Sequence, residues 1–217
     1  MISVLIIVAI LIVGTVVYLI VKGSKTKHKA KDIRSIAESH DLKKITIEHI
    51  DQMKDGSEFE IYLYRLFVKL GYAGVYKTVG SRDFGADVVF TDREGIRNVI
   101  QAKRYSPENK VGIGAVQEAF SCMRYYKAKK SMVITTSTFT DSCETLAGIN
   151  HVKLLDRDDL IAIIKCLQKD DIAAIKNRIE AEPRMILESW NEMNRSELHE
   201  IKKDHKAEEL LQKMKSS

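Results

Sequence analysis

The segment from residue 86 to residue 103 constrains the fold of this chain more than any other. It contains two short strand-like stretches, residues 86–91 and 97–103, on either side of the sequence Asp-Arg-Glu-Gly at residues 92–95. Such stretches on either side of a polar turn that ends in glycine are typical of two β-strands in a hairpin. The sequence therefore predicts a β-hairpin with its turn at residues 92–95.

Three polar side chains interrupt the two predicted strands. Asp87 lies in the first strand, and Gln101 and Lys103 lie in the second. Because successive side chains alternate across a sheet, Gln101 and Lys103 share one face with Val99, while the intervening residues point to the other face. The turn also brings residue 87 roughly opposite residues 99–101. We therefore expect the three polar groups to converge at one place.

A carboxylate in an apolar strand requires a compensating partner, because burying an unpaired charge is costly. The ammonium of Lys103 is one candidate, in an ion pair with Asp87 that packs the hairpin. A divalent cation is the other. Mg²⁺ prefers oxygen ligands and keeps several of its waters, so one or two protein ligands are enough. Asp87 and Gln101 are the predicted metal ligands.

The same three residues suit the hydrolysis of a phosphodiester bond. A bound Mg²⁺ or Mn²⁺ polarises a phosphoryl oxygen and lowers the pKa of the attacking water. A neighbouring lysine positions that water or offsets the charge that grows in the transition state. Asp87, Gln101 and Lys103 are therefore the candidate catalytic residues.

A fourth candidate lies on the helix predicted over residues 57–70, which begins with Ser57 as a plausible N-cap and ends at Gly71. At about 100° per residue, Glu60 falls at the edge of the apolar stripe of this helix. A glutamate that faces the sheet would reach the metal through a water. The alternative role for Glu60 is a partly exposed salt bridge, and for Gln101 a plain sheet amide.

Hydrophobic periodicity predicts an α/β fold with a mixed sheet and the order α-β-β-β-α-β-α-β-α. Helices are expected at residues 57–70, 111–127, 140–147 and 158–167, and strands at 72–79, 86–91, 97–103, 131–136 and 152–155. Residues 47–53 are expected to form a further short helix. Residues 170–217 are expected to be wholly helical, with Pro183 breaking or starting a helix.

Several motifs follow one another in a specific order: Glu-Phe-Glu60, Phe-Gly-Ala-Asp87, Gln101-Ala-Lys103-Arg-Tyr, and Val-Ile-Thr-Thr136 with Phe139-Thr140. Over residues 55–168 this series resembles the Mrr-type restriction endonuclease family, a branch of the PD-(D/E)xK nuclease superfamily. The resemblance implies a restriction-endonuclease-like three-layer core (αβββαβ).

The resemblance also implies an active site made of Glu60, Asp87, Gln101 and Lys103 that cuts DNA with a divalent metal. Gln101 stands where most of the superfamily has Asp or Glu, as is usual in the Mrr branch. Family members that cut modified DNA usually carry a separate DNA-recognition domain, and this sequence shows no helix-turn-helix signature.

Four further residues are candidates for contact with nucleic acid. They are Ser81, Arg82, Arg104 and Gln117. A simple turn is the alternative role for residues 81–83, and a solvated helix face is the alternative for Gln117. Lys127, Lys129 and Lys130 would steer DNA electrostatically or simply remain solvated.

Residues 3–21, SVLIIVAILIVGTVVYLIV, contain no charged side chain. At about 1.5 Å rise per residue, such a run spans roughly 30 Å as a helix, the hydrocarbon thickness of a bilayer. A cleaved signal peptide is the competing interpretation. It normally has a basic segment before a shorter apolar core, whereas only Met1 and Ile2 precede this run. We predict a transmembrane helix over residues 1–22.

Six basic residues lie between residues 22 and 34, directly after the apolar run. The excess of positive charge places this flank in the cytoplasm, so we expect a single-pass protein of the cell membrane with a cytoplasmic C-terminal domain. The three cysteines, Cys122, Cys143 and Cys166, match no zinc-binding spacing and are expected to be free thiols, as in a reducing compartment.

The sequence thus divides into a transmembrane helix (1–22), a basic linker (23–55), a nuclease domain (56–168) and a C-terminal helical extension (169–217). The net charge of +5 is compatible with an anionic partner. We expect a DNA endonuclease that uses no small-molecule cofactor, and a homodimer would suit double-strand cutting. The alternatives are a tethered DNA-binding or scaffold module with the same fold, and a nuclease for branched DNA.

Overall fold

The computed structural model describes residues 41–79 and 84–183. Its helices and strands follow the predicted order. They are η1 (Leu42–Lys44), α2 (Ile47–Asp51), α3 (Gly56–Lys69), β1 (Ala73–Lys77), β2 (Val88–Thr91), β3 (Arg97–Lys103), α4 (Gly114–Ser121), α5 (Met123–Tyr126), β4 (Lys130–Thr135), α6 (Asp141–Asn150), β5 (Val152–Leu155), α7 (Arg157–Gln168) and α8 (Ile172–Glu180).

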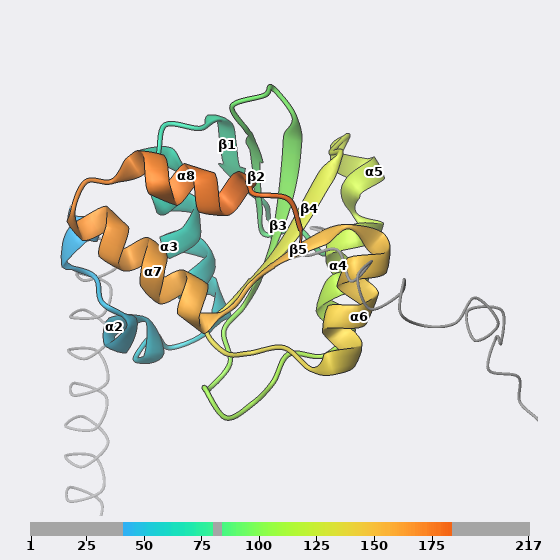
Figure 1. Ribbon diagram of the computed structural model, residues 1–217, viewed down its shortest axis with the longest axis horizontal. Helices are drawn as coiled ribbons and strands as arrows, with labels where there is room; N and C mark the ends of the chain where they lie inside the picture. The colour runs from blue at the N-terminus through green and yellow to red at the C-terminus, as the bar shows by residue number, and fades with distance from the viewer. Residues whose placement is uncertain (1–40, 80–83, 184–217) are drawn as a thin grey trace, which may run out of the picture.

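The five strands form one mixed sheet in the order β1-β2-β3-β4-β5 (Figure 1). The β1–β2 and β2–β3 pairs are antiparallel, whereas β3–β4 and β4–β5 are parallel. Parallel neighbours require a crossover connection, which the helices after β3 and β4 supply. This arrangement confirms the predicted α/β class and the mixed sheet.

The β2–β3 hairpin turns at residues 92–95, as predicted. The backbone N–H of Asp92 donates to the Ile96 carbonyl at 2.9 Å, and the Asp92 carboxylate accepts from the N–H of Ile96 at 2.8 Å. Burial raises the pKa of Asp92, but hydrogen bonds from Asn98, Ile96 and Lys130 outweigh this effect and hold the pKa below its usual value. The turn is therefore fixed by its own side chain, which sets the register of the two strands.

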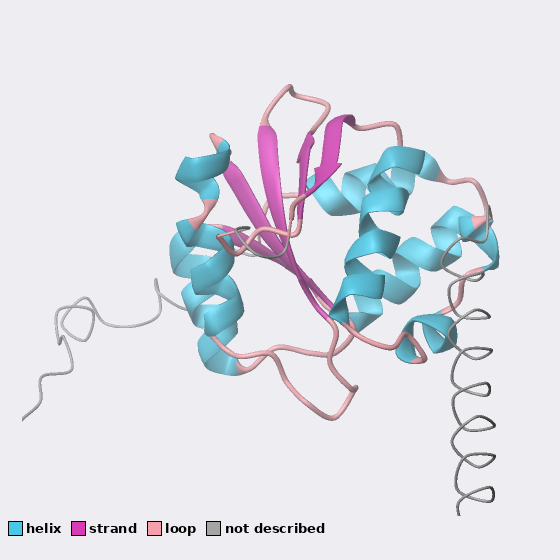
Figure 2. Cartoon of the chain, turned by 180° about the vertical axis from the view of Figure 1, so that it is seen from behind, coloured by secondary structure: helices cyan, strands magenta, loops and turns pink. Residues whose placement is uncertain are grey.

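Helices cover both faces of the sheet (Figure 2). Helices α3, α7 and α8 share one apolar cluster with the sheet, and α4, α5 and α6 pack against the other face. Ile100 belongs to the first cluster and Val99 to a cluster on the second face, which confirms the predicted alternation along β3. The domain thus has three layers, with one apolar core on the α3 side of the sheet and two smaller cores on the other side.

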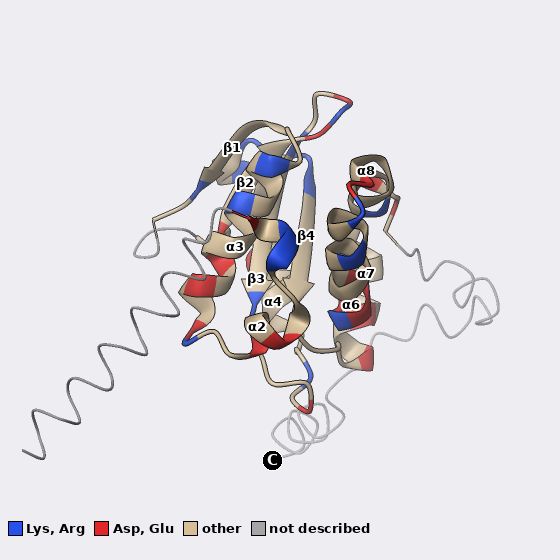
Figure 3. Cartoon of the chain, turned by 90° about the vertical axis from the view of Figure 1, so that its left-hand side faces the viewer, with Lys and Arg blue, Asp and Glu red and all other residues tan. Residues whose placement is uncertain are grey.

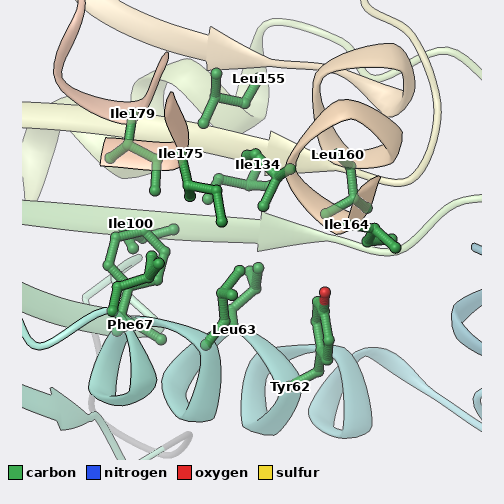
Figure 4. Close-up of a cluster of buried hydrophobic side chains, with 14 of the residues drawn as sticks. Tyr62, Leu63, Phe67, Ile100, Ile134, Leu155, Leu160, Ile164, Ile175 and Ile179 are labelled. Atoms are coloured by element: carbon green, nitrogen blue, oxygen red, sulfur yellow. The ribbon is translucent and has the colours of Figure 1, made fainter. Parts of the chain in front are cut away.

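The larger core lies between α3, the sheet, α7 and α8 (Figure 4). Phe67 of α3 is fully buried in it, with its ring 4.6 Å from Phe90 of β2 and 5.5 Å from Tyr72. Such offset and tilted ring pairs are favourable beyond the area that they bury. This aromatic cluster fixes α3 against the antiparallel half of the sheet.

The packed domain is larger than the predicted range of residues 56–168. Part of the expected linker is buried in the larger core, including Leu42, Ile45 and Ile50. Ile175 and Ile179 of α8 are buried in the same core. The Arg157 guanidinium also binds both carboxylate oxygens of Asp51, at 2.7 and 2.8 Å, and so fastens α2 to α7. The sparse apolar residues of these segments gave a weaker signal than the strands did.

Several helix boundaries differ from the prediction; for example, α6 ends at Asn150, three residues later than expected. The helix expected over residues 111–127 is divided at Cys122 into α4 and α5. Helix α3 begins two residues earlier than Ser57 suggested, because Asp55 is the N-cap and its carboxylate accepts from the N–H groups of Ser57 and Glu58.

Some predictions fall on residues outside the described ranges. They concern the apolar run of residues 3–21, the loop residues Ser81 and Arg82, and the helical tail from residue 184. Within residues 41–79 and 84–183, no helix combines the length and the hydrophobicity needed to cross a bilayer. Cys122, Cys143 and Cys166 are free thiols, as predicted, and burial raises the pKa of Cys143 to about 11.

We predict that Phe67→Ala lowers the free energy of unfolding by about 3–5 kcal/mol, because it leaves a cavity between α3 and β2. Val68→Ala is the matched control on the same helix. Val68 is 50% exposed, so its truncation should change stability by less than about 0.5 kcal/mol. Urea unfolding followed by circular dichroism measures both values. Equal effects of the two substitutions would contradict the assigned core.

Candidate active site

Asp87 lies where the β2–β3 ladder ends. Its backbone N–H donates to the Ile100 carbonyl at 2.7 Å, and its carbonyl accepts from the N–H of Thr78 in the chain that follows β1, at 3.0 Å. On the same side of β3 as the Ile100 carbonyl, the next N–H is that of Ala102. It donates to Oδ2 of the Asp87 carboxylate, at 2.6 Å, in place of a backbone carbonyl of β2. The side chain is thereby fixed at the end of the strand pair.

Gln101 lies directly across from Asp87, as the register of Val88 with Ile100 requires. Its amide nitrogen donates to Asp87 Oδ2 at 2.7 Å, and both side chains are buried, with 5% of Asp87 and 6% of Gln101 exposed. The amide oxygen Oε1 of Gln101 is buried without a hydrogen-bond partner in the described part of the protein. A buried carbonyl oxygen without a donor is unfavourable, so this atom is available for a ligand.

Lys103 extends from the end of β3 toward α4. Its ammonium forms an ion pair with Glu118 of α4, with Nζ and Oε2 2.5 Å apart. The alternative prediction, an ion pair between Lys103 and Asp87, is therefore replaced by a pair with a residue 15 positions further along the chain. The Lys103 carbonyl accepts from the Thr135 hydroxyl of β4 at 2.8 Å, which fixes the backbone from which the lysine projects.

Sequence reasoning missed Glu118. Its neighbour Gln117 was the candidate on this helix, and the only sequence signal for Glu118 was its place beside the inward-facing Ala119. Gly85 explains why the loop before Asp87 lies so close to Glu118 of α4. It has a φ of +92°, and a Cβ there would lie 2.8 Å from both the Cβ and the carbonyl oxygen of Glu118. Only glycine lets the loop before Asp87 approach α4 so closely.

Glu60 lies on α3, and its catalytic role stays a prediction. Its carboxylate forms an ion pair with Lys77 of β1, at 2.7 Å. Lys77 pairs with Val88, whose side chain lies in the core beneath α3, so this ion pair lies on the α3 side of the sheet. Lys103 reaches toward α4 on the opposite side. The partly exposed salt bridge, the alternative role for Glu60, is what the structure shows.

The predicted nucleic-acid contacts are only partly described. Gln117 is exposed on α4. The Arg104 guanidinium turns toward the backbone carbonyls of Asp51 and Lys54, at 3.4 and 3.5 Å. It helps to hold the segment between α2 and α3, so a phosphate contact by Arg104 would need this interaction to break. Ser81 and Arg82 lie outside the described residues.

The donor atoms near Asp87 fit a hard divalent cation that keeps most of its waters. The described residues contain no group of three or more His, Cys, Asp and Glu side chains arranged around a metal site. Mg²⁺ does not need one, because it is often bound by one or two protein ligands and several waters. The Asp87 carboxylate and the unpartnered Oε1 of Gln101 are oxygen donors of the required kind.

A cavity of about 230 Å³ lies at the other end of the parallel strands. Its walls include Lys130 and Ser131 at the start of β4, Lys153 of β5, and the segment after α8. Gln101 and Lys103 lie at the opposite end of β3 from this cavity. The hollow is therefore separate from the candidate active site.

Comparison with known proteins identifies the domain. A sequence model of the Mrr catalytic domain, described as a restriction endonuclease, matches residues 50–164. The type IV methyl-directed restriction enzyme EcoKMrr of Escherichia coli (strain K12) is 31% identical over 115 residues, which are 50% of this chain and 37% of that enzyme. The chain thus spans little more than a third of the length of this relative.

Two restriction endonucleases are among the solved structures to which this chain is similar. The modification-dependent restriction endonuclease AspBHI aligns with a TM-score of 0.44 and 20% identity, over 62% of this chain and 38% of its own. The restriction endonuclease MspJI, solved with a 27-mer oligonucleotide, aligns with a TM-score of 0.43 and 17% identity, over 70% of this chain and 35% of its own.

The matched range of residues 50–164 covers more than half of the 217 residues, and it includes Asp87, Gln101, Lys103 and Glu118. The chain belongs to the Mrr family of restriction endonucleases.

Proposed function

We propose that this chain is a membrane-tethered, divalent-metal-dependent endonuclease that hydrolyses phosphodiester bonds of DNA. One observation supports the proposal above the others. Oε1 of Gln101 is buried and has no hydrogen-bond partner within residues 41–79 and 84–183, while the amide nitrogen of the same residue donates to the Asp87 carboxylate. An amide oxygen without a partner beside a fixed carboxylate suits a cation. Membership of the restriction endonuclease family supports cleavage of DNA as the reaction.

The roles of the residues follow from their positions. Asp87 and Gln101 would hold Mg²⁺ or Mn²⁺, which supplies polarisation of the phosphoryl group and activation of a water. Asp87 is fixed for this role by the Ala102 N–H. Lys103 lies two residues beyond Gln101 on the same face of β3, so its ammonium is placed to offset negative charge on the scissile phosphate.

The net charge of +5 is compatible with an anionic substrate. The charged residues of the five strands are all basic, but Lys77 is paired with Glu60 and Lys130 with Asp92 and Glu94, so they do not form a cationic patch at the site. The helices carry both signs of charge (Figure 3). EcoKMrr is described as methyl-directed, and we propose modified DNA as one substrate to test first. Double-strand cutting would suit a homodimer in which each active site cuts one strand.

We predict that Asp87→Asn and Lys103→Met each reduce cleavage of plasmid DNA by at least about a hundredfold. Asn keeps an acceptor for the Ala102 N–H but loses the charge that the metal needs, and Met keeps the length of lysine without its ammonium. The measurement is the rate of nicking by the full-length chain with Mg²⁺ or Mn²⁺, on unmodified and methylated plasmid.

The matched controls are Asp158→Asn and Lys165→Met, both on α7 and away from the site. They should leave the rate unchanged. Mg²⁺ or Mn²⁺ should also raise the thermal unfolding midpoint of the parent and not that of Asp87→Asn. Full activity of both site variants, or cleavage in excess EDTA, would contradict the proposal. Salt-sensitive DNA binding without any cleavage would favour a binding module.

Glu118→Gln tests whether the ion pair with Lys103 serves catalysis. Glu118 is 47% exposed on its side chain, so the pair contributes at most about 1 kcal/mol to stability. We expect kcat to fall about tenfold because Lys103 is no longer held in place, while KM for DNA falls or stays constant because a negative charge has been removed. Glu144→Gln on α6 is the control. A loss of stability that matches the loss of activity would indicate a purely structural role.

The membrane anchor is a separate proposal, supported by the charge-free run of residues 3–21 and the basic flank after it. The full-length protein should sediment with membranes and resist alkaline extraction, and a protein without residues 2–22 should be soluble. Removal of the last 21 residues is the length-matched control. In sealed vesicles of known orientation, protease should reach a C-terminal tag only from the cytoplasmic side; the opposite result would reverse the topology.

A further inference from the structure

We infer that Phe84 and Tyr125 form a stacking site for an unpaired nucleobase, so that this nuclease acts on DNA with unpaired bases next to the cleaved phosphate. The inference rests on the proposed function, since it names the class of DNA that the same site takes. It is carried by the exposure of these two rings, by the backbone at Phe84, and by the position of the pair beside Asp87.

The two aromatic rings are held together at the protein surface. Phe84 is 57% exposed and Tyr125 is 63% exposed, although their ring centroids are only 4.4 Å apart, with the planes tilted by 41°. Tyr125 also contacts Tyr126 edge-on at 4.9 Å, and Tyr126, the last residue of α5, is buried against the sheet. The buried ring positions Tyr125, and Tyr125 positions Phe84, but much of both exposed rings remains open to solvent.

The backbone at Phe84 is in a conformation that an aromatic residue rarely adopts. Its φ is +49°, and the next residue, Gly85, has a φ of +92°. Left-handed backbone favours glycine and is unfavourable for a bulky side chain. The Phe84 ring is not buried in any of the three cores. A strained backbone that presents an aromatic ring to solvent indicates a role other than stability.

The aromatic pair adjoins the candidate active site. Phe84 is three residues before Asp87, and Gly85 between them lies against Glu118, the partner of Lys103. A base stacked on these rings would therefore belong to a nucleotide near the phosphate that Lys103 faces. The aromatic site and the catalytic residues are continuous along one short loop.

Exposed basic residues lie close to Tyr125 along the chain. Arg124 precedes it on α5, Lys127 is the C-cap of this helix, and Lys129 lies just before β4. Positive side chains interleaved with exposed aromatic rings are the combination with which proteins bind single-stranded nucleic acid, because the cations contact the phosphates while the rings stack on bases.

The requirement for an unpaired base follows from the structure of the duplex. Inside a duplex both faces of each base are covered by neighbouring bases, so a ring on the protein surface has no base face to contact. A base in a single-stranded tail, a gap or a bulge has a free face, and stacking on it is tolerant of sequence. The site thus predicts selection by DNA structure and not by base sequence.

Binding is tested with the full-length chain that carries Asp87→Asn, so that the DNA stays intact. The probes are a 12-mer single strand, a blunt duplex, and the same duplex with a three-nucleotide bulge, each with 2-aminopurine at one position. We expect the single strand and the bulged duplex to bind at least about tenfold more tightly than the blunt duplex. Fluorescence of 2-aminopurine in the unpaired stretch should be quenched on binding.

Phe84→Gly is the decisive variant, because glycine removes the ring and also relieves the left-handed backbone. It should fold at least as well as the parent and bind the bulged duplex roughly tenfold more weakly, with the quenching lost. Tyr125→Ala should weaken binding similarly, and Tyr125→Phe should restore it. Ile149→Ala on α6 removes a side chain of 50% exposure elsewhere and should have no effect.

Two results would overturn the inference. One is equal affinity of the Asp87→Asn chain for the blunt and the bulged duplex. The other is unchanged binding of the bulged duplex when Phe84→Gly or Tyr125→Ala is added to that chain. Neither result depends on cleavage. If the parent, with Asp87 intact, failed to cut any of these substrates while the binding differences were observed, the proposed nuclease activity would fail and the nucleobase site would stand.

Discussion

The hydrogen bond from the Ala102 N–H to the Asp87 carboxylate is the interaction on which the site depends. At this point the β2 backbone no longer pairs with β3, and a side-chain oxygen replaces the missing carbonyl at 2.6 Å. The same oxygen accepts from Gln101 at 2.7 Å. Asp87 thus completes the hydrogen bonding of the sheet and also places a carboxylate at the end of the β2–β3 strand pair. The need to satisfy a backbone N–H fixes the carboxylate in one orientation, which is the precision that a metal ligand needs.

Three neighbouring features fix the backbone around Asp87 and Gln101. The Asp92 turn sets the β2–β3 register, the Thr135 hydroxyl fixes the end of β3, and Gly85 lets the preceding loop lie against α4. The aromatic core beneath α3 supports the strands from the other side. The site therefore combines a rigid sheet edge with the strained, exposed turn at Phe84. The rigid strands fix Asp87 and Gln101, whereas the turn leaves the Phe84 ring exposed beside Tyr125.

Much of this arrangement could be predicted from local sequence patterns. The β2–β3 hairpin, the alternation of Val99 and Ile100 and the position of Asp87 opposite Gln101 follow from strand periodicity and one turn. Prediction was weaker where long-range contacts decide. Glu60 lies at the right angle on its helix but pairs with Lys77, because the β1 register brings that lysine beneath α3. The helix break at Cys122 and the packing of residues 41–55 also depend on distant partners.

The sequence by itself determined most of the elements, their order, the hairpin and the candidate site residues, because strand and helix periods and turn residues act over a few positions. Only the tertiary structure decided which charges pair. It paired the Lys103 ammonium with the Glu118 carboxylate and placed the Phe84 ring beside that of Tyr125. It also left Oε1 of Gln101 without a hydrogen-bond partner among the described residues. Those outcomes depend on how helices pack on the two faces of the sheet. A side chain's partner is set by that packing, and the spacing of residues along the chain does not encode it.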